Sequence, residues 1–154
     1  MRTLTRRAAC LATLALLAPA RLAAAPAANL AATPDKPVRI PLPADRAANA
    51  VLVDLYARAY TPPKRGAVEA VVSVGPEGQG MEIGRFAVFP AEPFLAANPQ
   101  DQRGYRFDAS AALAAFKDKP LVVEVKLVPT DAKVLPEGAM LTLSRVELSA
   151  RPGS

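Results

Sequence analysis

The sequence predicts an all-β fold, an antiparallel β-sandwich of about seven strands with one short helix capping one end. Three observations support this class. Short runs rich in Val, Leu, Ile and Tyr alternate between apolar and polar residues, as half-buried strands do. Gly- and Pro-rich turns separate these runs at the spacing of a sandwich. The chain of 154 residues is 51% hydrophobic, which suits a single folded domain.

Residues 1–28 have the pattern of a signal peptide and are set apart from the fold. Three arginines precede an apolar run at 8–20, and small residues follow it. The paired arginines at 6 and 7 suit a twin-arginine signal as well as an ordinary secretory one. The apolar run is too short to span a bilayer comfortably, so we expect a periplasmic or secreted protein without stable membrane insertion after cleavage. Residues 29–37 predict a flexible Ala/Pro-rich lead-in, and residues 38–151 a single β-sandwich domain.

The charge balance after the signal peptide argues against nucleic-acid binding. Four of the 19 basic residues and none of the 14 acidic residues lie within residues 1–25, which leaves a net charge of +1 in the remainder. The only cysteine, Cys10, also lies in this leader. We therefore expect the mature domain to be stabilised by its hydrophobic core rather than by a disulfide.

The strands are predicted at residues 38–42, 50–60, 67–75, 81–89, 105–108, 121–128 and 139–149. In the second of these, alternation places Val51, Val53, Leu55, Ala57 and Ala59 on one face. It places Leu52, Asp54, Tyr56, Arg58 and Tyr60 on the other. The apolar alternation changes phase midway through two further strands, and such a change requires a bulge. We expect these bulges near Gly84–Arg85 and Ser144–Arg145.

One helix is predicted, at about residues 109–117. Asp108 or Ser110 can cap it by accepting a free backbone N–H, and Pro120 ends it. Leu113 and Phe116 lie three residues apart and form a narrow apolar stripe. Such a stripe favours a structural lid over one open end of the sandwich rather than a binding helix.

The residue types needed for common catalytic and metal sites are missing. The chain has no histidine, which excludes Ser–His and Cys–His nucleophile systems and imidazole metal ligands. The glycines of "GPEGQG" at 75–80 indicate a hairpin turn, because no helix or Lys-Ser/Thr follows them as in a phosphate loop. We therefore predict a protein that is not an enzyme, with no catalytic residues, no cofactor-binding residues and no metal ligands.

Two features are candidates for binding a partner. The first is the strand face that carries Tyr56, Arg58 and Tyr60, since Tyr and Arg are favoured at interfaces. An ordinary solvent-facing sheet explains these residues equally well. The second is the loop at 89–104, in which Phe94 and Leu95 follow a proline. Phe94 either projects from this loop or tucks back into the core, and the sequence leaves both possibilities open.

The order of elements resembles the C-terminal β-sandwich domain of polyphenol oxidases and tyrosinases. The resemblance covers about residues 50–149 and runs through "VSV", a Gly-rich turn, "IGRFAVFP", a loop, "YRFDASAALAAF", "LVVEVKLVP" and "MLTLSRVEL". In that family the β domain covers the copper site of a separate helical domain and places a blocking side chain in its entrance. The resemblance implies an exported accessory or shielding partner of a tyrosinase-like dicopper oxidase. It carries no blocking residue over to this chain. On physical grounds Phe94 is the candidate plug, because an aromatic side chain on a loop can fill an apolar entrance without binding copper.

A second function remains open at this point. The protein is alternatively a general periplasmic or extracellular binding or structural module for a carbohydrate, a lipid or an envelope protein. Its site would then be the face carrying Tyr56, Arg58 and Tyr60. The sequence does not specify the oligomeric state.

Overall fold

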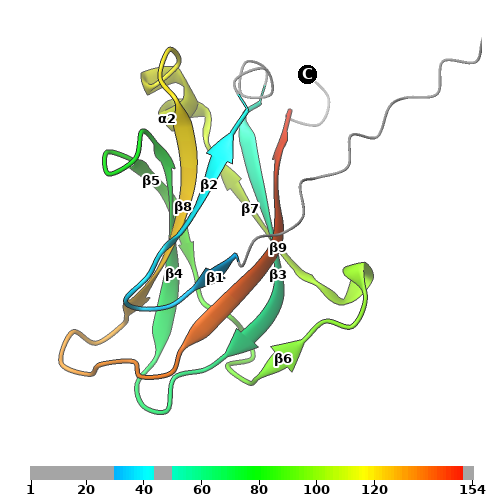
Figure 1. Ribbon diagram of the computed structural model, residues 1–154, viewed down its shortest axis with the longest axis vertical. Coiled ribbons are helices and arrows are strands. Elements are labelled where there is room, and N and C mark those ends of the chain that lie inside the picture. Colours follow the sequence, from blue (N-terminus) through cyan, green and yellow to red (C-terminus); the bar gives the residue numbers. More distant parts are fainter. Residues whose placement is uncertain (1–29, 44–49, 151–154) are drawn as a thin grey trace, which may run out of the picture.

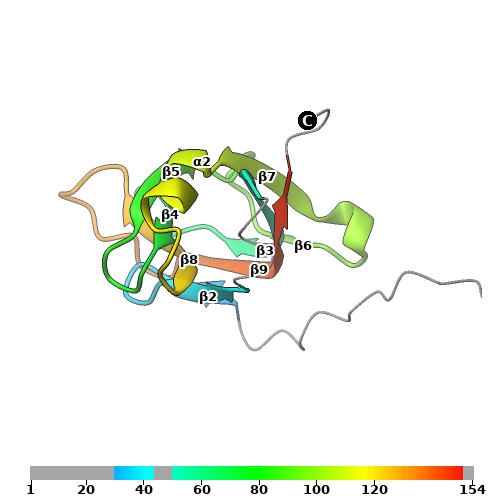
Figure 2. The same ribbon diagram turned by 90° about the horizontal axis from the view of Figure 1, so that it is seen from above.

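The computed structural model describes residues 30–43 and 50–150, and it confirms the predicted β-sandwich. Two antiparallel sheets, one of five strands and one of four, pack face to face (Figure 1). The predicted signal peptide at residues 1–28 lies outside the described residues. Figure 2 shows the two layers from above, with the short helix close to β4 and β5 at one end.

The five-stranded sheet is built around β3 (Leu52–Thr61). Along one edge β3 pairs with β9 (Met140–Ser149), and β9 pairs in turn with β1 (Ala31–Ala32). Along its other edge β3 pairs first with β7 (Arg103–Asp108) and then with β6 (Phe94–Leu95). The loop that connects the two sheets between β5 and β7 therefore contributes a strand of its own to this sheet.

The four-stranded sheet has the order β2 (Val38–Leu42), β8 (Leu121–Pro129), β4 (Val68–Gly75) and β5 (Met81–Phe86). All seven predicted strands are present in the two sheets, together with the short strands β1 and β6. β5 ends at Phe86, three residues before the predicted end, because residues 87–89 leave the ladder to begin the following loop. This difference changes the environment of Phe89.

The predicted lead-in at 29–37 requires a correction. Ala31 and Ala32 form β1 and pair with Thr142 and Leu141 of β9, and the side chain of Ala32 is fully buried. The sandwich therefore begins before residue 38. Alternation did not reveal this strand because it is two residues long and consists of alanine, which gives no contrast between its faces.

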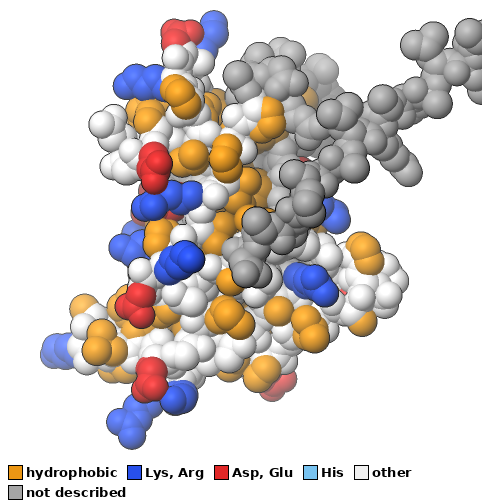
Figure 3. Space-filling model, viewed as in Figure 1, with side chains coloured by type: hydrophobic (Ala, Val, Ile, Leu, Met, Phe, Trp, Pro, Cys, Tyr) orange, Lys and Arg blue, Asp and Glu red, His pale blue; other side chains and the backbone are white. Residues whose placement is uncertain are grey.

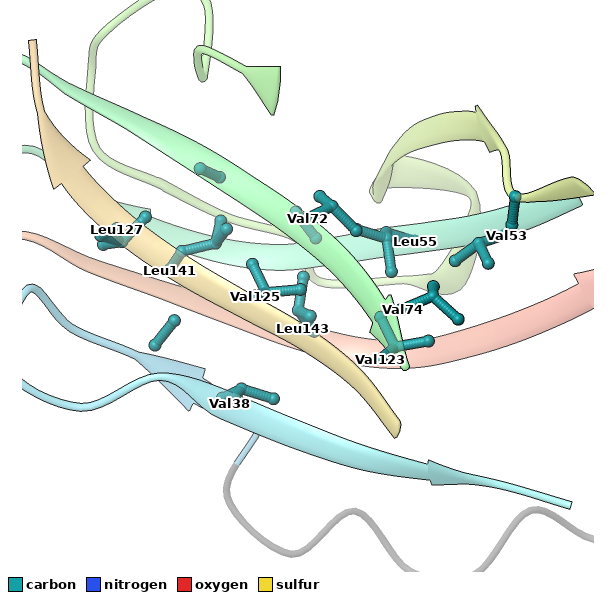
Figure 4. Packing of buried hydrophobic residues seen from close by; sticks show 14 of the residues in the cluster. Val38, Val53, Leu55, Val72, Val74, Val123, Val125, Leu127, Leu141 and Leu143 are labelled. Carbon is teal, nitrogen blue, oxygen red and sulfur yellow. The ribbon is translucent and has the colours of Figure 1, made fainter. Parts of the chain in front are cut away.

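The core lies between the two sheets and is made of alternate residues from both (Figure 4). Leu55, Leu141 and Leu143 of the five-stranded sheet face Val72 and Val125 of the four-stranded sheet. All five side chains are buried. Burial of apolar area contributes on the order of 25 cal/mol per Å². This layer is therefore the main stabilising element of the domain, which contains no cysteine and so no disulfide.

The two predicted changes in apolar alternation occur at β-bulges, where one strand of a ladder has an extra residue. In β9 the extra residue is Ser144, as predicted, because Tyr56 pairs with Arg145 and Ala57 with Leu143. In β5 the extra residue is Ile83, directly before the predicted Gly84. β3 contains a further bulge at Arg58 that the sequence did not indicate.

The helix α2 (Ser110–Ala115) is shorter than predicted but uses the predicted stripe. Ala112 and Leu113 are buried, and Phe116 packs against the core directly after the helix. The N-cap residue is Ala109, and no side chain caps the helix, so the predicted capping by Asp108 or Ser110 is wrong. The Ser110 N–H instead donates to Asp108 Oδ1 over 2.9 Å, in a local turn at the start of the helix. The apolar stripe is thus used to close one end of the sandwich.

A seam of aromatic rings joins β5 to β7 across the edge of the two sheets. The rings of Phe86 and Tyr105 stack with centroids 3.8 Å apart, and Phe107 lies 6.0 Å from Phe86. Gly84 leaves space for Phe107, since a Cβ at position 84 would lie 2.5 Å from Phe107 Cδ1. This seam places the start of the β5–β7 loop beside the five-stranded sheet.

Candidate partner-binding surface

The outer face of the five-stranded sheet carries a polar network centred on Asp54. Asp54 is only 6% exposed. Arg106 Nε of β7 donates to Asp54 Oδ1 over 2.6 Å, and Ser149 Oγ of β9 donates to Oδ2 over 2.8 Å. One carboxylate therefore links three neighbouring strands. This network is a structural element of the sheet and leaves Asp54 little capacity for another ligand.

The pKa of Asp54 reflects two opposed effects. Burial raises the pKa because it disfavours the charged carboxylate, and this is the largest single contribution. The hydrogen bonds from Arg106 and Ser149 and the positive charge of Arg106 lower it, and together they outweigh burial. The folded protein therefore holds the pKa of Asp54 below its ordinary value, so ionised Asp54 stabilises the fold.

Asp54→Asn is expected to destabilise the protein near neutral pH and to have little effect in acid. A depressed pKa contributes stability above the unfolded pKa, and that stability is lost as pH falls through the folded pKa. Loss of the charged acceptor should cost about 1–2 kcal/mol at pH 7. Urea unfolding at a series of pH values from neutral to acid measures this difference. Asp118→Asn, at an exposed position, is the control, and an equal loss for Asp54→Asn at all pH values would contradict the prediction.

The predicted stripe of Tyr56, Arg58 and Tyr60 is not a single surface. Tyr60 is 4% exposed and belongs to the core, and burial raises the pKa of its hydroxyl. The bulge at Arg58 causes this change, because it reverses the alternation so that Ala57 and Tyr60 both face inward. The predicted common face is therefore wrong.

Tyr56 and Arg58 stay on the outer side, but Tyr56 is already in contact with its own sheet. The guanidinium carbon of Arg145 lies 3.8 Å from the centroid of the Tyr56 ring. Arg145 Nε also lies 2.9 Å from Glu147 Oε1. A ring face covered by a paired arginine is not open for stacking against a sugar. The described structure thus offers no three-residue binding stripe on this face.

The β5–β7 loop (residues 87–102) presents a different surface. It contains β6 and a short 3-10 helix, η1 (Pro99–Asp101). Phe94 is half-buried and packs against the core, so the structure favours the second of the two possibilities for this residue. Its neighbour Leu95 is 74% exposed, and Phe89 is 85% exposed. The loop therefore holds two large apolar side chains in solvent.

The loop is fastened to the sheet at several points. Tyr60 and Ala59 of β3 pair with Phe94 and Leu95, and the Ala96 N–H donates to the carbonyl oxygen of Arg58 over 2.7 Å. A hollow of about 340 Å³ adjoins this attachment, lined by residues that include Arg58, Ala96, Gln102 and Ser144. The surface thus combines projecting apolar side chains with an adjacent hollow.

Arg103, the first residue of β7, holds the other part of the loop. Its Nη1 donates to the carbonyl oxygens of Phe89 and Pro90 over 3.0 and 3.4 Å. Its guanidinium carbon lies 4.0 Å from the centroid of the Phe94 ring. One side chain therefore connects the exposed Phe89 segment to the half-buried Phe94.

Sequence reasoning missed both Phe89 and Arg103. Phe89 was assigned to the end of a strand, where alternation gives it a packing role. The sequence nevertheless contained a signal for the position of Phe89. Pro90 has no backbone N–H to donate to a neighbouring strand, which indicates that the strand ends before Pro90. Arg103 carries no local signal for its role in the loop, since the loop residues that it contacts are 9 to 14 positions away.

Two features were looked for within residues 30–43 and 50–150: a cluster of metal-binding side chains and a membrane-spanning helix. No group of three or more His, Cys, Asp or Glu side chains in these ranges is arranged to hold a metal ion. In the same part of the chain, no helix combines the length and hydrophobicity needed to cross a membrane. Neither any protein-family model nor any curated protein matches this chain.

Proposed function

We propose that the protein is an exported, non-enzymatic β-sandwich that binds and covers a protein partner, and that this partner is a tyrosinase-like dicopper oxidase. The observation that carries the proposal is the β5–β7 loop. It holds Phe89 and Leu95 85% and 74% exposed while its backbone is bonded to the rigid sheet. Aromatic side chains such as that of Phe89 are enriched in the cores of protein interfaces.

The choice of partner rests on the resemblance of residues 50–149 to the β domain of polyphenol oxidases and tyrosinases. That domain covers a copper site and places a side chain in its entrance. A chain without histidine has no imidazole to offer to copper, so in this proposal the copper ligands belong to the partner. An apolar side chain on a loop can fill an apolar entrance without acting as a ligand.

The proposal places the complex outside the cytoplasm. The pattern of residues 1–28, with arginines before an apolar run and small residues after it, supports export to the periplasm or beyond. A shielding partner of a secreted oxidase would need the same destination as the oxidase.

Site-specific photo-crosslinking tests this function. A photoreactive residue at position 95 is expected to crosslink, in the native periplasm, to a protein with two copper-binding histidine clusters. The same residue at position 118, which is exposed at the helix end of the sandwich, is the control and should not. Added in excess, the purified protein should also slow phenol oxidation by that oxidase. Equal crosslinking from both positions, or oxidation that is unchanged in excess protein, would contradict the proposal.

The alternative is a general binding module for a carbohydrate, a lipid or an envelope protein. That alternative depended on Tyr56, Arg58 and Tyr60 as a common site. Tyr60 is in the core and Tyr56 is covered by Arg145. The loop surface is therefore the better-supported candidate, and no contact among the described residues favours the stripe over it.

A further inference from the structure

Part of one edge of β9 pairs with no other strand in the described part of the chain. On one side β9 pairs with β3 along its whole length. On its other side it pairs only with β1, and the last contact there is the hydrogen bond that the Leu143 N–H donates to the Leu30 carbonyl oxygen over 2.8 Å. Beyond this contact, residues 144–149 have no described partner strand on that side. This segment is the open edge of β9.

The open edge has few of the features that prevent a strand edge from pairing with another chain. Such features include proline, lysine, inward-pointing charges and bulges. β2, an edge strand of the other sheet, carries Pro41. The open edge has neither proline nor lysine, and its bulge at Ser144 lies at one end. Its inward-facing residues, Val146 and Leu148, are apolar and only partly buried. The edge is therefore suited to the addition of a strand.

The outward-facing side chains of the open edge carry opposite charges. Arg145 lies over the ring of Tyr56 on the outer face, and its Nε lies 2.9 Å from Glu147 Oε1. If two copies pair antiparallel around a two-fold axis at Val146, Arg145 of each copy lies opposite Glu147 of the other. Opposite charges directly across a ladder stabilise the pairing, whereas like charges weaken it.

The neighbouring registers do not have this complementarity. An axis at Arg145 places two arginines opposite each other, and an axis at Glu147 places two glutamates opposite each other. An axis between two residues sets the apolar side of one copy beside the charged side of the other. The register with Val146 on the axis pairs residues 144–148 of each copy. It therefore ends one residue before Leu143, whose N–H is already bonded.

We propose that the open edge of β9 binds the open edge of a second copy of this chain, antiparallel and with Val146 on the two-fold axis. The two five-stranded sheets then form one continuous sheet, as in an isologous dimer. The interface is small, so the dimer is expected to be weak. It does not depend on the proposed oxidase partner, because β6 of the β5–β7 loop lies at the opposite end of the strand order from β9.

Charge reversal tests this register. In sedimentation velocity, the wild type should shift from monomer towards dimer as its concentration rises to about 1 mM. Arg145→Glu and Glu147→Arg each place like charges opposite each other at two positions, and each should weaken dimerisation at least about tenfold. An equimolar mixture of the two variants should dimerise again, because every glutamate then faces an arginine. Lys126→Glu, at an exposed position on β8, is the control and should dimerise like the wild type.

Two outcomes of this experiment would overturn the proposal. One is a wild type that stays monomeric over the whole concentration series. The other is a mixture that dimerises no better than the single variants. Both samples contain this protein alone, so either outcome leaves the proposed oxidase partner untouched.

A cysteine at the axis tests the register without changing a charge, in case the charge-reversed variants fail to fold. Val146→Cys is made together with Cys10→Ser, so that the new thiol is the only one in the chain. Oxidised glutathione should convert two such thiols into a disulfide between two copies, because opposite Cβ atoms of an antiparallel pair lie about 4.5–5.5 Å apart. Val122→Cys, at a half-buried valine of β8, is the control. Equal yields of crosslinked dimer from positions 146 and 122 would overturn the proposal.

Discussion

Leu143→Ala is expected to lower the free energy of unfolding by about 3 kcal/mol. Leu143 is buried in the middle of β9 and faces the valines of the opposite sheet (Figure 4). Truncation of a buried leucine loses its transfer free energy and leaves a cavity, and the two together cost about 2–5 kcal/mol. Urea unfolding followed by circular dichroism measures the difference.

The matched control for this prediction is Leu135→Ala. The same atoms are removed, but Leu135 is 86% exposed and so has little packing to lose. Its effect should stay within about 0.5 kcal/mol. Equal effects of the two substitutions would show that Leu143 is not at the centre of the core. On the face drawn in Figure 3, acidic, basic and apolar side chains are interspersed over the described residues.

Gly84→Ala is expected to destabilise the protein by about 2 kcal/mol, although alanine usually stabilises a strand relative to glycine. The added Cβ would lie 2.5 Å from Phe107 Cδ1 and 2.9 Å from Phe107 Cε1. Either the Phe107 ring or the β5 backbone has to move, and overpacking of this kind costs about 1–3 kcal/mol. Thermal and urea unfolding of the variant give the magnitude.

The double variant Gly84→Ala with Phe107→Leu distinguishes a clash from a backbone effect. Because the shorter side chain removes the contact, the combined loss should be smaller than the sum of the two single losses. Gly104→Ala is the control glycine, since a Cβ there would meet Tyr56 Cε1 at an ordinary 3.6 Å. Additive losses would assign the effect to the backbone of β5 and contradict the clash.

The strands of the two sheets could be predicted from the sequence because large apolar side chains on one face of a strand alternate with polar side chains on the other. β9 illustrates this. Leu141 and Leu143 are large, and so are Val146 and Leu148, so the change of phase between the two pairs indicates a bulge at Ser144, where the structure has it. The lid helix was likewise visible because Leu113 and Phe116 stand out among alanines.

The binding surface was harder to predict because it depends on contacts with no local pattern. In β3 the bulge at Arg58 was hidden by Ala57 and Ala59, since alanine is equally compatible with either face. The misplacement of Tyr60 follows from that single ambiguity. The environments of Phe89 and Phe94 were equally hard to predict, because Arg103, from the following strand, contacts the backbone of one and the ring of the other.

The two bulges between β3 and β9 compensate each other. β9 has one extra residue, Ser144, and β3 has one, Arg58. Beyond both bulges, Ala59 therefore pairs with Thr142 in the same register in which Leu52 pairs with Ser149 at the other end of the ladder. Within each strand, the extra residue lets two apolar side chains three positions apart face the core: Ala57 and Tyr60 in β3, and Leu143 and Val146 in β9. Between the two bulges, only Ala57 and Leu143 pair at a different offset. The two strands therefore change phase at the same level of the ladder and keep one common register at both of its ends.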